Sequence, residues 1–250
     1  MSFASTILNY KVSLSIKLLR WASKFRNVAF CFSGGKDSLV VLDLIAKIPE
    51  LKEKIIILAD DPISDPRHDQ YIKEILELYG FKNIQWLRDY IPSYAWNYTV
   101  DKTGDVVVCC YYLKILPVRK FICENLIECC IVAIRADEHP ERAKEKYVSL
   151  REIEACEKAN YQTWKYFRLH PILNWTIRDV FSYIIQNNLK LSPLYFDGYT
   201  SLQCLPCMKK LKPFKDIFEL AEYCIQHGDR QVRVEEKEAV MHILRKMGYF

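Results

Sequence analysis

The feature that most limits how this chain can fold is a succession of short apolar runs that alternate with segments of helical periodicity. The apolar runs cover residues 27–32, 54–59, 83–87, 128–134 and 166–172. Apolar residues at helical spacing occupy 7–23, 37–48, 67–80, 110–125 and 174–188. Strands that are apolar throughout belong to parallel sheets with helices on both faces. The sequence therefore predicts an α/β fold with a doubly wound, mostly parallel five-stranded sheet.

The composition supports one main globular unit with helical extensions at both ends. Half of the 250 residues are hydrophobic and 27% are charged, so the chain can bury a substantial core. We expect an N-terminal helix within residues 1–25, a main α/β domain over 26–210, and a tail of two helices over 211–250.

Nothing in the sequence predicts a membrane segment. The longest apolar stretches, 55–59 and 129–134, are far shorter than the roughly 18 residues that a spanning helix needs. The first residues lack the basic start, apolar core and cleavage site of a signal peptide. We therefore expect a cytoplasmic protein with no membrane partner. A net charge of +5 suits an anionic small molecule, and it is compatible with nucleic acid without requiring it.

The turn after the first predicted strand has the composition of a phosphate-binding loop. Two adjacent glycines allow a tight turn that exposes backbone N–H groups, and the start of the next helix adds its positive end. An ordinary strand-to-helix turn is the alternative, but the whole chain has only seven glycines. The loop is not a Walker A motif, because the spacing differs. Its residues are Ser33, Gly34, Gly35, Lys36, Asp37 and Ser38.

Nine of the ten cysteines fall into two groups. Five lie in or near apolar segments and are expected to be inert core thiols, because cysteine packs as a small hydrophobic residue: Cys31, Cys123, Cys129, Cys130 and Cys156. A secreted disulfide framework does not suit a chain with a core of this size. Four others form an adjacent pair and a CxxC, and their thiolates suit either a cubane iron–sulfur cluster or a tetrahedral zinc ion. These four are Cys109, Cys110, Cys204 and Cys207.

The SGGKDS segment resembles the loop of the PP-loop ATP pyrophosphatase superfamily. That superfamily includes sulfonucleotide reductases, the small subunit of ATP sulfurylase, FAD synthetases and several thiolation enzymes. The resemblance implies an adenine nucleotide alpha hydrolase-like fold. It also implies that residues 33–38 bind the phosphates or sulfate of an adenine nucleotide.

Later segments narrow the resemblance to the iron–sulfur type of adenylyl-sulfate and phosphoadenylyl-sulfate reductases. Residues 133–143, AIRADEHPERA, are similar to a G-x-R-x-D/E-x-x-x-R-A pattern, with alanine in place of the glycine. The similarity implies substrate-binding roles for Arg135, Asp137, Glu138 and Arg142, although a solvated charged turn is the alternative. The CC pair and GYTSLQCLPC (198–207) resemble the ligands of a [4Fe–4S] cluster, and Lys114 matches a lysine beside that cluster.

The chain departs from these reductases in its last segment. The family attacks its substrate with a cysteine in an ECG(L/I)H sequence, whereas residues 211–250 contain only Cys224, three residues before His227. The resemblance makes Cys224 the candidate nucleophile, which a nearby base would activate. The alternative is a structural cysteine on the apolar face of a helix. This departure puts reductase activity in doubt.

The sequence as a whole predicts an adenine-nucleotide-binding iron–sulfur protein that reduces adenylyl sulfate or 3′-phosphoadenylyl sulfate, with a thioredoxin-like reductant as partner. One alternative is an ATP-dependent enzyme that transfers sulfur to nucleic acid and needs Mg²⁺. In that case the lysines at 209, 210, 212 and 215 would follow a phosphate backbone. The other alternative is a nucleotide-binding or redox-sensing module without turnover.

Overall fold

A computed structural model describes residues 3–59, 64–93, 110–160, 162–202, 204, 208 and 210–229. Within these residues six strands form one sheet in the order β3–β2–β1–β4–β6–β5. All neighbouring strands are parallel except β5 and β6, which are antiparallel. The strands are β1 (Val28–Phe32), β2 (Ile56–Ala59), β3 (Ile84–Trp86), β4 (Cys129–Val132), β5 (Val148–Cys156) and β6 (Gln162–Leu169).

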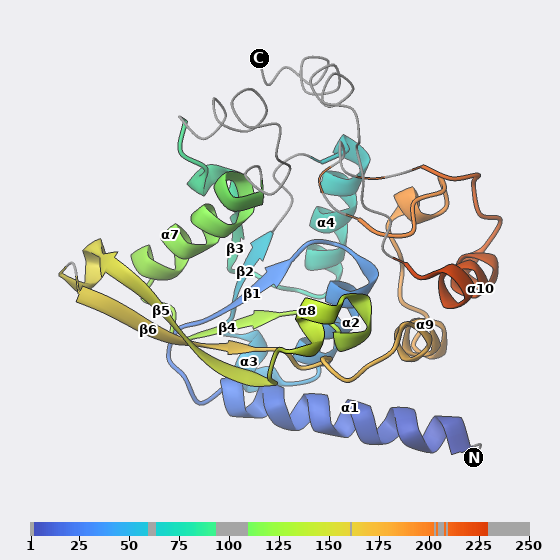
Figure 1. Cartoon of the computed structure of the whole chain (residues 1–250), viewed down its shortest axis with the longest axis horizontal. Coiled ribbons are helices and arrows are strands. Elements are labelled where there is room, and N and C mark those ends of the chain that lie inside the picture. The colour runs from blue at the N-terminus through green and yellow to red at the C-terminus, as the bar shows by residue number, and fades with distance from the viewer. Residues whose placement is uncertain are drawn as a thin grey trace.

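Helices connect the strands and cover the sheet (Figure 1). The α-helices are α1 (Phe3–Ala22), α2 (Lys36–Ala46), α3 (Pro49–Lys52), α4 (Pro66–Leu78), α7 (Leu116–Glu124), α8 (Pro140–Ala143), α9 (Ile177–Gln186) and α10 (Ile217–His227). Short 3₁₀ turns include η1 (Leu87–Tyr90), η3 (Ala136–Glu138), η4 (Glu157–Ala159) and η5 (Pro193–Tyr195). None of the described helices is long and apolar enough to cross a bilayer.

Each face of the sheet has its own apolar core. One core joins β1, β2 and β4 to α1, α2, α4 and α9, and includes Phe30, Leu42 and Trp175. The other lies under α7 and includes Phe121 and Ile122. Figure 1 shows α7 on the opposite side of the sheet from α2 and α9. The strands are apolar at consecutive positions because both faces are covered, which confirms the predicted doubly wound class.

The predicted strand count was one too low, because β5 was missed. Only β6 pairs with this strand, and most of its side chains are exposed or half-buried. An edge strand with a solvated face has no continuous apolar run. Its charged residues, among them Arg151, Glu152 and Glu154, therefore concealed it.

Most predicted helices begin and end within a few residues of the observed ones. Asp65 caps α4 by accepting a hydrogen bond from the Arg67 N–H, and Thr176 and Asp179 form a capping box at the start of α9. The helix predicted over 110–125 begins instead as a π-helical turn, η2 (Tyr111–Ile115), before α7. Of the two helices expected in the tail, α10 is observed and residues 230–250 lie outside the described part of the chain.

Two cysteines expected as inert thiols form a disulfide instead. Cys123 at the end of α7 is bonded to Cys156 at the end of β5, with 5.6 Å between their Cα atoms. The bridge ties α7 to the antiparallel edge of the sheet. Their separation of 33 residues offered no sign of the pairing, because only the tertiary fold brings the two segments together.

The strand order predicts a crevice at the carboxyl ends of the paired strands β1 and β4. From β1 the chain runs through α2 to β2 on one side, whereas β4 lies on the other side of β1. Such a switch in strand order opens a crevice at the carboxyl ends of the two strands, which is where open α/β sheets bind ligands. The loop of residues 33–38 follows β1, and Arg135 follows β4. Both predicted substrate-binding segments therefore meet at this edge.

Candidate functional site

The backbone of the loop depends on Gly34. This residue has a φ of +70°, and a Cβ there would lie 2.6 Å from Cε1 of His68 and 2.8 Å from Cγ1 of Ile72. Side chains other than hydrogen are therefore excluded on both conformational and steric grounds. Gly35 adopts an extended conformation at φ −73° and is the N-cap of α2. The two glycines thus turn the chain into the first turn of α2.

Two buried residues from distant segments hold the loop in place. The backbone N–H of Lys36 donates a hydrogen bond to the Tyr195 hydroxyl at 2.8 Å. Nε2 of His68 lies 2.8 Å from the Ser33 carbonyl oxygen, and its Nδ1 lies 2.9 Å from Ser192 Oγ. Sequence analysis did not single out His68, Ser192 or Tyr195. These residues are far from the loop in sequence, so no local sequence pattern indicated that they contact it.

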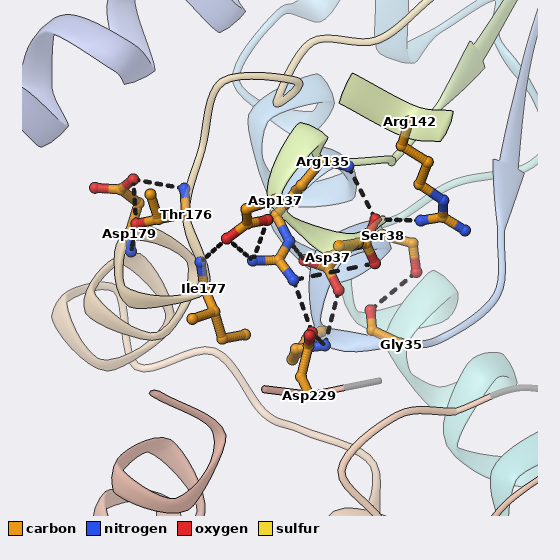
Figure 2. Close-up of polar contacts among 12 residues, drawn as sticks. Gly35, Asp37, Ser38, Arg135, Asp137, Arg142, Thr176, Ile177, Asp179 and Asp229 are labelled. Carbon is orange, nitrogen blue, oxygen red and sulfur yellow. Dashed lines mark hydrogen bonds and ion pairs between the residues drawn. The ribbon is translucent and has the colours of Figure 1, made fainter. Parts of the chain in front are cut away.

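Under the loop lies a buried network of opposite charges (Figure 2). The Lys36 ammonium pairs with Asp37 at 2.9 Å and also with Asp229. The Arg135 side chain is fully buried, and its guanidinium lies 2.7 Å from both Asp37 and Asp229. Figure 2 shows Arg135 extended between Asp37, Asp137 and Asp229. Sequence analysis did not single out Asp229, which lies just beyond α10.

The network keeps Lys36 and Asp37 charged despite their burial. Burial lowers the pKa of Lys36, but Asp37, Tyr195 and Asp229 outweigh it, so that its pKa lies well above the usual value. Burial raises the pKa of Asp37, yet the charges of Lys36 and Arg135 bring it below the usual value. Paired charges are the form in which buried ions are tolerated. The loop therefore rests on a base of paired, buried charges.

The residues after β4 connect this network to α8 and α9. Asp137 lies beside the Arg135 guanidinium at 3.2 Å and accepts a hydrogen bond from the Ile177 N–H at 2.9 Å, at the start of α9. Glu138 accepts a hydrogen bond from the Arg135 backbone N–H and pairs with Arg142. The alternative of a solvated turn therefore does not describe this segment, although a direct contact of these residues with substrate stays a prediction.

A cleft of about 250 Å³ opens above the loop. It gathers the loop, Arg142 and Lys114, which come from three different parts of the sequence. Arg135 does not line the cleft itself; its guanidinium pairs with Asp37, which does. The basic groups and the loop amides make the cleft suitable for an anion. Its lining includes Cys31, Ser33, Gly35, Lys36, Asp37, Ser38, Lys114, Glu138, Arg142 and Tyr195.

Three carboxylates near the loop could also approach a metal ion. Asp37, Glu138 and Asp229 each place an oxygen within 4.8 Å of the others. However, Lys36 and Arg135 already pair with Asp37 and Asp229. In this arrangement cations of the protein balance the carboxylates, so their charge does not require a bound metal.

The candidate cluster ligands are only partly within the described residues. Cys110 is exposed at the start of η2, and Cys204 is half-buried; both are thiols and not disulfides. Cys109 and Cys207 lie outside the described residues. Lys114 is in η2, close in sequence to Cys110, and lines the cleft above the loop. The two described thiols thus fit a thiolate-bound metal in their chemistry and accessibility.

The candidate nucleophile Cys224 lies inside the core. Its side chain in α10 has no exposed surface, and burial raises the pKa of the thiol to about 12. Phe218, on the same helix, is by contrast 64% exposed. In this conformation Cys224 is a protonated core residue, and its catalytic role stays a prediction of the sequence.

The fold and the site together define an α/β protein with a cleft suited to an anion at the carboxyl edge of a parallel sheet. Residues 27–210 match the family model described as the phosphoadenosine phosphosulfate reductase domain. The chain belongs to this family, as the sequence predicts. The match excludes α1 and α10, which lie on either side of the matched region.

Known relatives agree with this assignment. The chain is 26% identical to adenosine 5′-phosphosulfate reductase 1 of Bacillus subtilis (strain 168) over 206 residues, which are 79% of this chain and 80% of the relative. It is 27% identical to reductase 2 of the same strain over 200 residues, 77% of this chain and 78% of that one. The chain therefore resembles sulfonucleotide reductases, and its family is a family of enzymes.

Solved structures show the same fold. Phosphoadenylyl-sulfate reductase from Candida auris matches with a TM-score of 0.50 and 16% identity, over 78% of this chain and 92% of that chain. An FMN adenylyltransferase from Candida glabrata matches with a TM-score of 0.58 and 17% identity, over 95% of this chain and 82% of that chain. At these identities the comparison extends to the fold alone, so it does not distinguish the activities of the two proteins.

Proposed function

We propose that this protein is a reductase of adenylyl sulfate or 3′-phosphoadenylyl sulfate. The observation that carries the proposal is the single cleft in which the phosphate loop, Arg142 and Lys114 meet. Loop amides suit the phosphate of the nucleotide, while the two basic side chains suit the remaining anionic charge. The names of the curated relatives, adenosine 5′-phosphosulfate reductases, support the same substrate class.

The proposal includes a [4Fe–4S] cluster bound by Cys109, Cys110, Cys204 and Cys207. Support comes from the spacing of the four cysteines, and from the accessible, non-disulfide state of Cys110 and Cys204. When bound, the cluster would add negative charge, which the Lys114 ammonium would offset. Iron and sulfide content after anaerobic purification tests this part. One equivalent of zinc in a colourless protein would replace the cluster with a structural zinc site.

The chain's own residues would perform the binding steps. The loop of 33–38 would hold the nucleotide phosphate through backbone amides, and Tyr195 and His68 would keep that loop in shape. Lys114 would then hold the sulfate end. The electrons for reduction would come from thiols, with a thioredoxin-like protein or another dithiol as the final donor.

Binding and turnover of adenylyl sulfate test the function directly. We expect calorimetry to show binding of adenylyl sulfate, and we expect sulfite release in the presence of a dithiol. Lys114→Gln should weaken binding about tenfold or more, because a hydrogen bond to a charged group contributes roughly 1.5–3 kcal/mol.

The matched control is Lys120→Gln, an exposed lysine of α7 that pairs with Glu124 at 3.7 Å, away from the cleft. This variant should bind as the wild type does. Equal binding by the two variants would remove Lys114 from the site. Sulfite formation that never exceeds the blank, despite tight binding, would contradict the reductase proposal.

A further inference from the structure

A second cavity adjoins the cleft above the loop, on the α7 face of the sheet. Its volume is about 610 Å³, which is within the range of small-molecule sites. One wall comes from η2 and α7, and the other comes from β5 and β6 (Figure 1). The cavity and the cleft share three lining residues, which are Cys31, Lys114 and Val132. A molecule bound in the cleft can therefore extend into the second cavity.

Part of the second cavity is apolar and suits a flat base. Val118 of α7 and Val132 of β4 line it, together with the buried ring of Tyr166 in β6. Ile115 and Leu150 also line it, although they are 49% and 54% exposed. Accessible apolar side chains that gather in one cavity are typical of small-molecule sites, which are lined mainly by apolar groups. A bound adenine ring would cover these side chains.

The second cavity also contains positive charge that the described residues do not balance. Arg119 of α7 and Arg168 of β6 line it from its two walls. Neither arginine forms an ion pair with any other residue that the structure describes. The acidic residue of the wall, Glu152, pairs instead with Lys165 at 3.1 Å. The two guanidinium groups therefore favour an anion between α7 and β6.

Arg168 lies close to the junction of the two cavities. It pairs in register with Cys130 on β4, two residues before Val132, and its side chain lines the cavity on the α7 face of the sheet. Adjacent strands are about 4.8 Å apart, a distance that an extended arginine side chain spans. A group bound beside Val132 is therefore within reach of the Arg168 guanidinium.

We propose that the second cavity binds the adenosine part of the substrate and that Arg119 and Arg168 bind a phosphate on its 3′ oxygen. The preferred substrate is then 3′-phosphoadenylyl sulfate and not adenylyl sulfate. This inference rests on the proposed function and decides between the two substrates that it leaves open. The 5′ and 3′ oxygens belong to one ribose, so a single nucleotide occupies both the cleft and the cavity. Planar guanidinium groups form paired hydrogen bonds with phosphate oxygens, which suits two arginines to this task.

Calorimetry with two nucleotides tests the inference on the unaltered full-length protein. The probes are adenosine 5′-monophosphate and adenosine 3′,5′-bisphosphate, which differ only in the 3′ phosphate. We expect the bisphosphate to bind at least about tenfold more tightly, because a hydrogen bond to a charged group contributes enough free energy for a change of this size. The value of kcat/KM for sulfite release should favour 3′-phosphoadenylyl sulfate over adenylyl sulfate by a similar factor with the same dithiol.

Variants of the two arginines test the groups named. Arg119→Gln and Arg168→Gln should each lower the affinity for the bisphosphate by roughly tenfold more than the affinity for the monophosphate. Arg168→Lys keeps a positive charge without the paired hydrogen bonds, so its loss should be smaller. The matched control is Arg178→Gln, an exposed arginine of α9 on the opposite side of the sheet from α7, which should keep the wild-type ratio of affinities. Comparing two nucleotides on each variant removes any effect on folding, because such an effect applies to both.

The outcomes separate this inference from the proposed function. Equal affinity of the wild type for the two nucleotides, with sulfite released from adenylyl sulfate, would overturn the inference and leave the reductase function intact. Equal losses for both nucleotides in the Arg119 and Arg168 variants would also overturn it, because these arginines would then bind a part that the nucleotides share. A preference for the bisphosphate without sulfite from either substrate would support the inference and contradict only the reductase function. Failure of the wild type to bind either nucleotide would overturn both.

Discussion

At the scale of single residues, the two adjacent glycines of the loop have different tasks. Gly34 has a positive φ and faces the His68 ring, so both its backbone and its surroundings require glycine. Gly35 has an ordinary φ, and a Cβ there would lie 3.3 Å from Ser33 Oγ and 3.5 Å from the Tyr195 hydroxyl oxygen. The sequence identifies the pair as important but treats its two members alike. Only the backbone conformation tells them apart.

Gly34→Ala should therefore be much more damaging than Gly35→Ala. Positive φ and the clash with His68 together should lower the free energy of unfolding by roughly 2–4 kcal/mol. Gly35→Ala, its matched control, should change that free energy by less than about 1 kcal/mol. Urea unfolding of both variants measures the difference. Equal stabilities would show that the loop does not require its left-handed turn.

At the scale of elements, α10 brings the tail of the chain to the phosphate loop. Asp216 caps the helix by accepting hydrogen bonds from the N–H groups of Phe218 and Glu219. Two residues after α10 ends, the Asp229 carboxylate pairs with Lys36 and Arg135. An anion of the protein thus contacts cations at the site where an anionic substrate is proposed to bind. This contact also anchors a segment that lies beyond the family match.

Asp229→Asn should strengthen the binding of adenosine monophosphate. Removing one buried negative charge leaves the positive charges of Lys36 and Arg135 less balanced, so they should attract an anion more strongly. A neighbouring charge of this kind changes the equilibrium constant of an ionic interaction by roughly tenfold or more. Calorimetry measures the affinity. Asp216→Asn is the control, because it changes a carboxylate of the same segment away from the loop. Weaker binding by Asp229→Asn would instead show that Asp229 helps to shape the site.

At the scale of the whole molecule, the fold joins segments that are distant in sequence around one crevice. The loop after β1, the arginine segment after β4, and η5 after α9 contribute Lys36, Arg135 and Tyr195. His170 directly follows β6 and is buried. Its Nδ1 lies 3.3 Å from the carbonyl oxygen of Val132. Burial lowers the pKa of His170 to about 4. Its titration therefore affects the stability of the entire fold.

Stability should fall as the pH drops below 6.5. The unfolded chain binds a proton on His170 near pH 6.5, whereas the folded protein binds it only near pH 4. The free energy of unfolding therefore falls as the pH drops between these values. At pH 5 the loss from this one group should be about 2 kcal/mol relative to pH 7. His170→Gln should lose less stability than the wild type between pH 7 and pH 5 in urea unfolding. His227→Gln, at an exposed position, should behave as the wild type does, and an equal loss in all three proteins would contradict the assignment.

The sequence by itself determined the class of the fold, the position of the glycine-rich loop between a strand and a helix, and the family. Each of these rests on residues that are close together in the chain: continuous apolar runs for buried parallel strands, SGGKDS between a strand and a helix, and the AIRADEHPERA segment. Local patterns suffice here because the burial of a strand and the binding of an anion at a helix N-terminus each depend on a few consecutive residues.

Only the tertiary structure decided which distant groups meet. The edge strand β5, the Cys123–Cys156 bridge, the Tyr195 hydrogen bond to the loop, and the approach of Asp229 to Lys36 all depend on how elements pack. The 3.8 Å distance between the Sγ atoms of Cys31 and Cys130 likewise depends on the pairing of β1 with β4, where these two residues are diagonal neighbours although they are 99 residues apart in sequence. Such contacts leave no periodic pattern in the sequence, because each depends on the three-dimensional placement of a single side chain.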